Sequence, residues 1–349
     1  MRNNSPKNFQ SINENVSKKA TLDDVAALAG VSPSTVSRIL NGTARVNESK
    51  VREVNAAISK LQYVPNPAAR LLARGRSMNV GVITQSLNSP YYGEAALAIE
   101  SVLLSLDYSP LFVSGHWRLQ DQRKCMNRLL TQKVEGLILI TSSIPDEELL
   151  KLSTSVPLVL IGRSLEAENI YCLDNDNVPA ARLATEYLIG QGHRKIAFIT
   201  GPSTHIDANQ RLEGYKLALA AKKITFSKSL LSTGDYTEAG GYSAMNQLID
   251  SKTEFTACFA ANDEMAFGAM LALYRHGLRV PQDISIMGFD DLHACSFTIP
   301  PLTSLHRSIE EVGEHAARGI VDLIEGRKPV SWTPTVRLSI RESTQSRLE

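Results

Sequence analysis

The chain has 349 residues, which is too many for one ordinary domain and about right for two or three. Hydrophobic residues make up 43% of it and charged residues 21%, which excludes a wholly disordered chain, and no stretch approaches the roughly 18 apolar residues that span a membrane. Residues 1–78 hold twelve Lys/Arg and five Asp/Glu, a net charge of +7, whereas residues 79–349 carry a net charge of −6.

The first 20 residues form a polar arm rich in Asn, Ser and Lys, and this composition predicts a disordered segment. The arm has no apolar run of the kind that a secretory signal peptide needs. The cysteines lie far apart, at Cys125, Cys172, Cys258 and Cys295, and have no zinc-ligand spacing. We therefore expect a soluble cytoplasmic protein with free thiols and with no metal or other cofactor.

Residues 21–63, the head, predict three short helices. Thr21 is suited to cap the first helix, which has acids in its first turn, and Gly30 is suited to end it in the left-handed conformation. Ser32 is suited to cap the second helix, with Pro33 at the first position, where a missing N–H costs nothing. The apolar side chains of the second helix then face a core. This leaves on its polar side Ser34, Thr35, Ser37 and Arg38.

A helix, a short turn with glycine and a second helix form the helix-turn-helix arrangement, whose second helix lies in the major groove of DNA. Asn47 opens a third helix, and its apolar face consists of Val51, Val54, Ile58 and Leu61. An ordinary three-helix bundle shows the same periodicity, and a net positive charge also fits a solvated basic tail. The capping pattern, the polar face and the positive charge together favour DNA binding.

From residue 80 onward, short apolar runs alternate with longer amphipathic segments. The runs predict strands at VGVIT (80–84), PLFVS (110–114), GLILIT (136–141), LVLIG (158–162), KIAFITG (195–201), TACFAAN (256–262) and ISIMGFDD (284–291). Helical periodicity lies between them, for example over 91–106, 180–189 and 208–221. This alternation predicts parallel sheets covered by helices on both faces. Because the units are too many for one small sheet, we expect two doubly wound lobes, with a ligand cleft at the carboxyl ends of their strands.

Two segments near the N-terminus, TLDDVAALAGVSPSTVSRILNG and LQYVPNPAARLLARGRS, resemble the head and hinge of the lac repressor/galactose repressor family. The resemblance continues through LIGQGHRKIAFITGP, RLEGYKLAL, FAANDEMAFGAMLAL, GLRVPQDISIMGFDDL and IPPLTSLHRS, and it covers residues 21 to about 343. It implies a transcription regulator, a repressor, whose head binds operator DNA and whose larger domain binds a small effector. The sequence of the larger domain is most similar to that of sugar-responsive members of the family.

The resemblance implies which residues of the head read DNA. In this family the second helix reads bases through its first residues and a later arginine, which correspond here to Pro33, Ser34 and Arg38. Arg38 is suited to a bidentate contact with guanine or to a phosphate contact, whereas Pro33 offers only an apolar contact. Members with polar side chains at the position of Pro33 make more direct hydrogen bonds to bases. Operator specificity would therefore depend here on Ser34, Arg38 and DNA shape. The residues expected at the DNA are Thr21, Ser32, Pro33, Ser34, Thr35, Ser37, Arg38, Asn41, Asn66, Ala69 and Leu72.

Residues 64–78 resemble the hinge of the family, a short helix that folds on DNA. Asn66 and Pro67 are suited to begin this helix. Leu72 matches the residue that wedges into the minor groove and kinks the duplex, and packing of Leu72 onto the rest of the protein is the alternative. Ala73 stands where many members have a lysine, which puts that minor-groove contact in doubt.

The resemblance implies that residues 79–343, the body, form a periplasmic-binding-protein-like domain, followed by a polar tail at 344–349. The first lobe would contain about 79–177 and 308–336, and the second about 178–307 and 337–343. The effector would bind between the lobes. The expected fold class is therefore an all-α helix-turn-helix head joined to an α/β body of two doubly wound lobes.

Matches to the family define an expected effector site. Tyr91 and Tyr92 would supply an aromatic platform and Arg211 a charged donor, while Asn262 and Asp290 lie at the carboxyl ends of predicted strands. Such groups suit a sugar, because polar side chains pair with hydroxyls and a ring covers the apolar face. The weaker candidates are His205, Asp207 and Asp174.

Each of these residues has a structural alternative. Asp290 fits a helix cap, Arg211 fits a surface ion pair, and the tyrosines fit a core. Trp117 is expected to pack within the protein rather than to contact a ligand, although it could reach the cleft. His193 is expected to be a structural residue in a turn before a strand.

An enzyme and a periplasmic binding protein are the rival classes. The sequence has no phosphate loop, no GxSxG, no HExxH and no GxGxxG after a strand, so we expect no catalysis. A periplasmic protein would need a signal peptide and would lack the basic head. The chain ends at TQSRLE, without the leucine heptads of a tetramerising tail, so we expect a homodimer on a near-palindromic operator.

Overall fold

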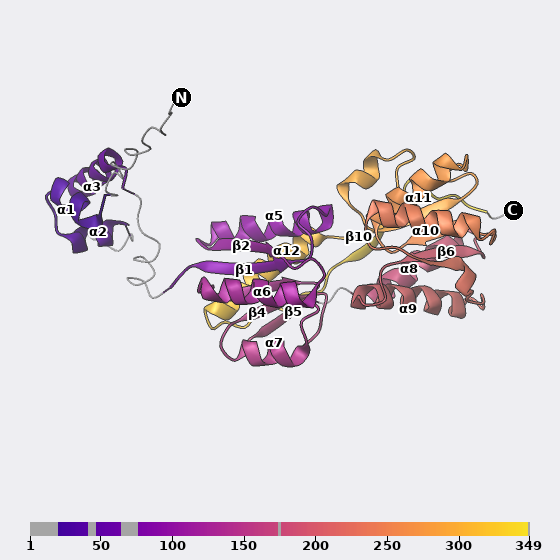
Figure 1. Ribbon diagram of the computed structural model, residues 1–349, viewed down its shortest axis with the longest axis horizontal. Coiled ribbons are helices and arrows are strands. Elements are labelled where there is room, and N and C mark those ends of the chain that lie inside the picture. Colours follow the sequence, from indigo (N-terminus) through magenta and orange to yellow (C-terminus); the bar gives the residue numbers. More distant parts are fainter. Residues whose placement is uncertain (1–19, 41–46, 64–75, 174–175, 348–349) are drawn as a thin grey trace, which may run out of the picture. The chain divides into compact units, whose positions relative to one another are not determined.

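The computed structural model describes residues 20–40, 47–63, 76–173 and 176–347. The chain divides into one unit of Met1–Ser77, which contains the head, and a second of Met78–Glu349, which contains the body (Figure 1). The structure thus separates a small helical unit from a large α/β unit, as the sequence predicted. In the described part of the chain, no helix is both long enough and apolar enough to cross a membrane.

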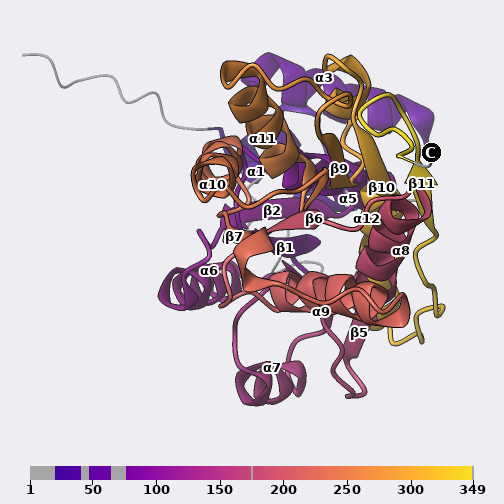
Figure 2. The same ribbon diagram turned by 90° about the vertical axis from the view of Figure 1, so that its right-hand side faces the viewer.

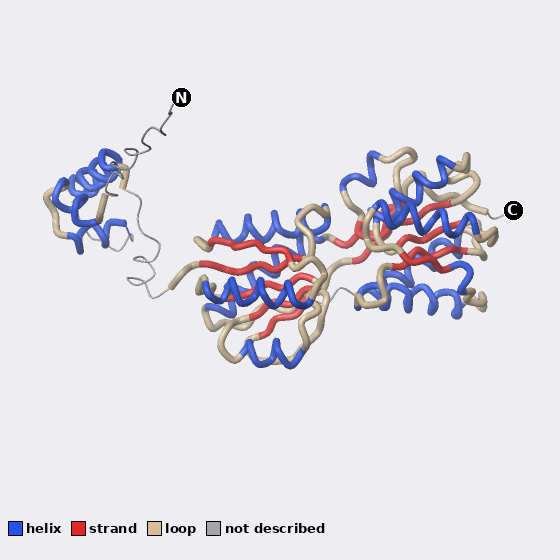
Figure 3. Tube along the Cα trace, in the orientation of Figure 1, coloured by secondary structure: helices blue, strands red, loops and turns tan. Residues whose placement is uncertain are grey.

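Capping interactions define the helices of the head, which are α1 (Leu22–Leu28), α2 (Pro33–Leu40) and α3 (Glu48–Leu61) (Figure 3). The Thr21 hydroxyl accepts the N–H of Asp24 at 3.2 Å, and the Asp24 carboxylate accepts the N–H of Thr21 at 2.8 Å. Gly30 has a φ of +62°, so it ends the first helix in the predicted left-handed conformation. Asn47 caps α3, as predicted. The core of the head is centred on Val25, Val36 and Val54.

The first lobe of the body is a five-stranded parallel sheet with the strand order β2-β1-β3-β4-β5. The strands are β1 (Asn79–Thr84), β2 (Ser109–Ser114), β3 (Gly136–Ile140), β4 (Leu158–Ile161) and β5 (Ile170–Leu173). Neighbouring strand residues point to opposite faces. Val82 belongs to the core under α5 (Pro90–Ser105) and α12 (Ile309–Ile324), whereas Ile83 belongs to the core under α6 (Leu119–Thr131) and α7 (Asp146–Ser153).

The second lobe is a six-stranded sheet with the order β11-β10-β9-β8-β6-β7, and only its edge strand β11 runs antiparallel to its neighbour. The strands are β6 (Ile196–Thr200), β7 (Leu231–Thr233), β8 (Ala257–Ala260), β9 (Ser285–Asp290), β10 (Thr303–Arg307) and β11 (Val336–Ser339). One helix pair is α8 (Asn177–Gly190) with α9 (Ile206–Ala221), and the other is α10 (Glu238–Asp250) with α11 (Asp263–Arg275). Figure 2 shows the two pairs on opposite sides of the sheet.

The chain passes between the lobes after β5, after β10 and after α12. As a result, α12 packs on the first lobe although β10 and β11, which flank it in the sequence, pair in the second sheet. The expected fold class is confirmed, and each of the seven predicted strands is present. The strands that the sequence analysis missed are β5, β7, β10 and β11.

Both parallel sheets reverse their strand order at an internal point, between β1 and β3 in the first lobe and between β6 and β8 in the second. Open α/β sheets bind ligands beside such a point, outside the carboxyl ends of the strands. The side chains at the carboxyl ends of the strands are therefore the candidates for contact with a ligand.

Candidate functional site

The polar face of α2 is the candidate DNA-reading surface of the head. Ser32, Pro33, Ser34 and Arg38 are exposed, Thr35 and Ser37 are half-buried, and Val36 is buried in the core of the head. The Ser32 hydroxyl accepts the N–H of Thr35 at 3.2 Å, so Ser32 starts the helix as predicted. The face that remains accessible is short and polar, with one guanidinium near its end.

The hydroxyl groups at the start of α2 contact one another. The Ser32 oxygen lies 2.8 Å from the Ser34 hydroxyl and 2.9 Å from that of Thr35. Thr21, also expected at the DNA, uses its hydroxyl in the cap of α1. The structure therefore gives Thr21 and Ser32 helix-capping roles. The other expected DNA residues, Asn41, Asn66, Ala69 and Leu72, lie outside the described residues, as do Pro67, Ala73 and Asp174.

The body contains a pocket of about 400 Å³ at the carboxyl ends of the strands of both sheets. Its lining comes from segments that follow β1, β2, β7, β8 and β9 and from the first turns of α5, α9, α10 and α11. The pocket is in the lower part of the size range that suits a small metabolite. The residues that line the pocket include Gln85, Ser89, Tyr91, Tyr92, Trp117, Asp207, Arg211, Asp235, Tyr236, Glu238, Asn262, Glu264 and Asp290.

A buried carboxylate between two buried guanidinium groups forms the centre of the pocket. Asp290, the last residue of β9, has its Oδ1 atom 3.6 Å from Nη2 of Arg211 and 3.8 Å from Nη2 of Arg307. Both distances exceed hydrogen-bond length, and Asp290 Oδ1 accepts no hydrogen bond from the described residues. Burial raises the pKa of Asp290 to about 6, and the two arginines oppose that rise.

Arg211 is held in place before any ligand binds. Its Nε donates to Asn177 Oδ1 at 2.9 Å, Nη1 donates to the carbonyl of Ala261, and its guanidinium carbon lies 3.8 Å from the centre of the Phe289 ring. Asn177 also donates to Asp207 Oδ1 at 3.0 Å. The start of α8 thus fixes the two charged residues of α9 that line the pocket, which favours a preorganised site.

The turn after β9 aims Asp290 into the pocket. Asp290 and Asp291 have φ values of +102° and +60°, a region that residues other than glycine rarely occupy. Asp263 stabilises this turn, because it accepts the N–H of Leu292 at 2.8 Å and the hydroxyl of Ser304 at 2.6 Å. The Ser304 oxygen in turn accepts the N–H of Asp291 at 3.2 Å. Burial raises the pKa of Asp263 to about 8.

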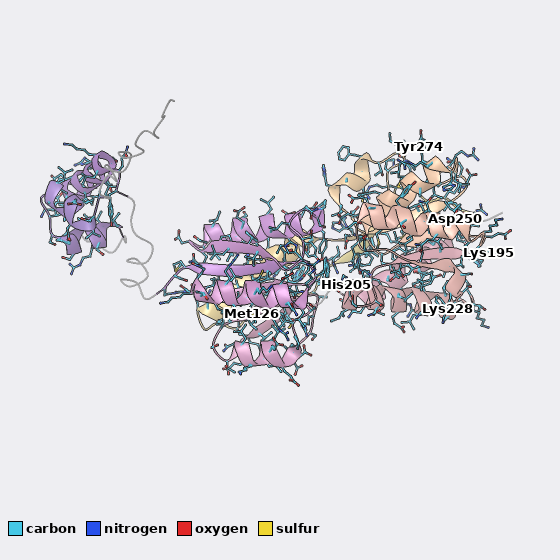
Figure 4. All side chains as sticks on the ribbon, viewed as in Figure 1. Met126, Lys195, His205, Lys228, Asp250 and Tyr274 are labelled. Atoms are coloured by element: carbon cyan, nitrogen blue, oxygen red, sulfur yellow. The ribbon has the colours of Figure 1, made fainter. Side chains whose placement is uncertain are left out.

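Aromatic rings from both lobes form a wall of the pocket. The ring of Trp117, after β2, lies 4.0 Å from that of His205, before α9, and the two planes differ by 14°. His205 is nearly parallel to Tyr236, after β7, at 5.7 Å. Figure 4 shows His205 where the two lobes meet. Burial lowers the pKa of His205, which favours a neutral imidazole in this stack.

A buried glutamine positions Trp117. Gln85, directly after β1, accepts the N–H of Trp117 at 3.1 Å and the side-chain amide of Gln122 at 3.1 Å. Its own amide donates to the carbonyls of Ile140 and Thr141. Trp117 has a φ of +58°, so these hydrogen bonds hold a residue in an uncommon conformation at the pocket.

Six of the seven expected effector residues line the pocket: Tyr91, Tyr92, Asp207, Arg211, Asn262 and Asp290. The seventh, His205, stacks on Trp117 behind that lining. Asn262 caps α11 through Met265 and donates to the Tyr236 carbonyl, so much of its hydrogen-bonding capacity is used within the protein. His193 hydrogen-bonds with Thr256 and Gln345 at the far end of β6, in agreement with its expected structural role.

The structure adds to the sequence analysis in two respects. Trp117 packs against the core of the body, as expected, and it also lines the pocket, because two left-handed residues turn the chain after β2 toward the second lobe. Arg307, Tyr236 and Glu264 were not identified as candidates. Arg307 stands at the end of the polar strand β10, and its Nη2 donates to the Tyr91 hydroxyl at 2.8 Å. Arg307 ends β10 and Tyr236 comes after β7, and neither strand has the apolar pattern that would have located these positions.

The part of the chain that the structure describes contains no group of three or more His, Cys, Asp or Glu that could hold a metal ion. The polar groups of the pocket are instead arranged as hydrogen-bond donors and acceptors around an enclosed space. This arrangement suits a small organic molecule with several hydroxyl groups.

Family models match both parts of the chain. The model for bacterial regulatory proteins of the lacI family matches residues 21–66, and that for a periplasmic binding protein-like domain matches residues 185–344. The ribose operon repressor of Escherichia coli (strain K12) is 35% identical over 299 residues, which are 85% of this chain and 91% of the relative. The transcriptional regulator CelR of Thermobifida fusca is 35% identical over 337 residues, 93% of this chain and 98% of the relative.

Solved structures of similar proteins cover nearly the whole chain. The lac repressor dimer bound to operator and the anti-inducer ONPF has a TM-score of 0.83 and 31% identity, over 94% of this chain and 100% of that one. The complex of the transcriptional regulator CelR with cellobiose has a TM-score of 0.70 and 34% identity, over 93% of this chain and 99% of that one. The similarity therefore extends to regulators solved with operator DNA and with a sugar.

Proposed function

This chain belongs to the lacI family of bacterial regulatory proteins, and on that premise we propose that it is a transcriptional repressor controlled by a sugar. Its head binds operator DNA through the polar face of α2. Its body binds the sugar in the pocket and performs no chemistry on it. Two chains act together as a homodimer in the cytoplasm, so that two heads meet half-sites about one helical turn apart.

The unsatisfied carboxylate of Asp290 between Arg211 and Arg307 carries this proposal. A sugar hydroxyl can donate to the Asp290 carboxylate and accept from a guanidinium at the same time, and charge-assisted hydrogen bonds of this kind are strong. The rings of Tyr91, Tyr92, Trp117 and Tyr236 offer apolar faces for the C–H face of the sugar. Together these groups match the mixed polar and apolar surface of a sugar.

Control of DNA binding follows from the construction of the pocket. Trp117 and Ser89 belong to the first lobe, whereas Asp207, Arg211 and Asp290 belong to the second. A sugar that contacts both sets stabilises one angle between the lobes. If operator binding also depends on that angle, the two equilibria are coupled, typically by about 1–3 kcal/mol.

A ligand screen tests the effector half of the proposal. We expect at least one sugar to raise the melting temperature of the full-length protein, since a ligand at a hundred times its Kd adds about 2.7 kcal/mol of stability. Asp290→Asn should raise the Kd for that sugar at least about tenfold, because it removes a charge-assisted hydrogen bond. Asp250→Asn, at the exposed end of α10 (Figure 4), is the matched control and should bind as the wild type does. Equal affinity of the Asp290 variant and the control would refute the pocket assignment.

A second variant tests the DNA-binding half. Arg38→Ala should weaken binding to an operator duplex, obtained by in vitro selection, by about 1–3 kcal/mol in fluorescence anisotropy, because a base or phosphate contact is lost. Its sugar affinity should not change. The two variants thus serve as reciprocal controls, since Asp290→Asn should bind operator normally but no longer respond to the sugar. A loss of sugar binding in Arg38→Ala would contradict the separation of the two roles.

A further inference from the structure

The charges in the pocket are unevenly distributed. At one end, Asp207 and Asp290 face the guanidinium groups of Arg211 and Arg307, so these charges compensate one another. The remaining lining includes Asp235, Glu238 and Glu264. Among the described residues that line the pocket, Arg211 is the only Lys or Arg. The second end of the pocket, defined by these three carboxylates, therefore has an uncompensated negative charge.

Glu264 is the buried member of this second end. It lies in the first turn of α11, is only 7% exposed, and accepts the hydroxyl of Ser89 across the lobe junction at 2.8 Å. Burial and the carboxylates of Glu238 and Asp290 raise the pKa of Glu264 to about 7, which the Ser89 hydroxyl opposes. Among the described residues, no lysine or arginine forms an ion pair with Glu264. A buried carboxyl without a partner cation is costly to ionise, and a cation from outside would relieve this cost.

The helices around the pocket do not offer a site for an anion. Helix N-termini attract phosphate groups through free N–H groups and a positive dipole end. Here, α9, α10 and α11 already carry a carboxylate in the first turn, namely Asp207, Glu238 and Glu264. Pro90 at the first position of α5 removes one N–H donor. A phosphate ester that enters this pocket would face carboxylates at the ends of α9, α10 and α11.

We propose that the effector is an unphosphorylated amino sugar whose ammonium group lies against the carboxylate of Glu264. This inference rests on the proposed function and names the chemical class of its sugar. The compensated end holds the hydroxyl groups, because Asp290 lines the pocket there and its Oδ1 atom accepts no hydrogen bond from the described residues. The negative end selects the amine and rejects phosphorylated analogues of the same sugar.

Isothermal titration calorimetry with matched ligands tests the proposal on the full-length protein at pH 7. Each set contains a hexose, its 2-amino-2-deoxy derivative and its 6-phosphate, in the gluco, galacto and manno series. In the series that binds, the amino sugar should bind at least about tenfold more tightly than the parent hexose, because a charge-assisted hydrogen bond is roughly twice as strong as a neutral one. The phosphate should bind more weakly than the parent.

The variant Glu264→Gln keeps the shape of the side chain and removes its charge. It should reduce the ratio of the two Kd values, parent over amino sugar, to about one, whereas Glu147→Gln on the exposed surface of α7 should leave that ratio unchanged. Equal binding of parent and amino sugar by the wild type, or tightest binding of the phosphate, would overturn this inference and leave the proposed function intact. If no ligand of any set binds while operator binding is preserved, the assignment of a sugar itself is overturned, and this inference with it.

Discussion

At the scale of single residues, burial sets the protonation of the pocket. Glu264 and Asp290 are both almost inaccessible to water, yet only Asp290 has arginines beside it. The pKa is raised to about 7 for Glu264 and to about 6 for Asp290. Burial is the largest cause of the rise in both pKa values, and it is opposed by the two arginines at Asp290 and by the Ser89 hydroxyl at Glu264.

The raised pKa of Glu264 predicts a pH-dependent stability of the ligand-free protein. Between its ordinary value of 4.5 and about 7, the unfolded chain releases this proton while the folded chain retains it. The contribution of Glu264 is therefore complete below pH 4.5 and is lost as the pH rises to about 7. We expect the free energy of unfolding of the wild type, relative to Glu264→Gln, to fall by an amount on the order of 1–3 kcal/mol over this range.

Urea unfolding at several pH values measures this difference. The comparison with Glu264→Gln is needed because Asp263 and Asp290 also have raised pKa values and contribute to the pH dependence of both proteins. A constant difference between wild type and variant from pH 4.5 to pH 7.5 would show that Glu264 titrates normally.

Part of the pocket could be predicted from the sequence, because some of its residues stand at the ends of strands that have a recognisable pattern. Asp290 and Asn262 follow strands that have clear apolar patterns, so their place at a strand end could be read directly. Tyr236 and Arg307 follow β7 and β10, which have no such pattern, so no strand end could be located for them. Glu264 stands in the first turn of a helix, where an acid is ordinary, and only its burial against Ser89 distinguishes it.

At the scale of elements, close helix contacts position the charged ends of the pocket. Helices α10 and α11 pack so closely that a Cβ atom on Gly268 would lie 1.9 Å from the carbonyl oxygen of Glu238 and 2.6 Å from the amide nitrogen of Tyr242. Glycine is therefore required sterically at Gly268 in a helix whose first turn carries Glu264. The same contact sets the separation of Glu238 and Glu264.

Gly268→Ala tests this contact. We expect the free energy of unfolding to fall by about 1–3 kcal/mol, because overpacking outweighs the better helix propensity of alanine. The effector should also bind more weakly, since α10 and α11 must move apart. Gly190→Ala, where a Cβ would meet nothing within 4 Å, is the control and should be neutral or slightly stabilising. Denaturant titration of both variants checks the difference, and similar unfolding of the two would argue against a tight contact.

The strands that sequence patterns missed share a physical reason. β5, β7 and β11 are edge strands of only four, three and four residues. β10 is buried but reads TSLHR, because its polar side chains serve the network around Asp263 and Asp291 rather than an apolar core. Apolar runs therefore identify central strands well, whereas a polar strand inside a lobe has no signal in composition.

At the scale of the whole molecule, charge separates the two activities along the chain. Residues 1–78 carry a net charge of +7 and the remainder a net charge of −6. The positive segment favours contact with phosphates, and the negative one opposes stray binding of the body to DNA. The two binding events should consequently respond to salt in different ways.

Operator affinity should fall by about 10³–10⁵ between 50 and 200 mM salt, as expected for about 6–10 phosphate contacts from two heads. Sugar affinity should change by less than about twofold over the same range, because the buried charges of the pocket are poorly screened. Anisotropy and calorimetry at four salt concentrations measure both slopes. An operator affinity that is flat in salt would contradict the assignment of the basic segment to DNA.

The passage of α12 back to the first lobe has a consequence for synthesis on the ribosome. The first sheet is complete once β5 has emerged, but one of its covering helices is Ile309–Ile324, and Gly136 in β3 lies directly under Ile320 of that helix. About 150 further residues must be translated before that cover exists, which takes roughly 8–30 s at typical bacterial rates. The lobe that is begun first therefore waits for a helix translated after most of the second lobe, and the part of its sheet that α12 covers is exposed to chaperones for most of that interval.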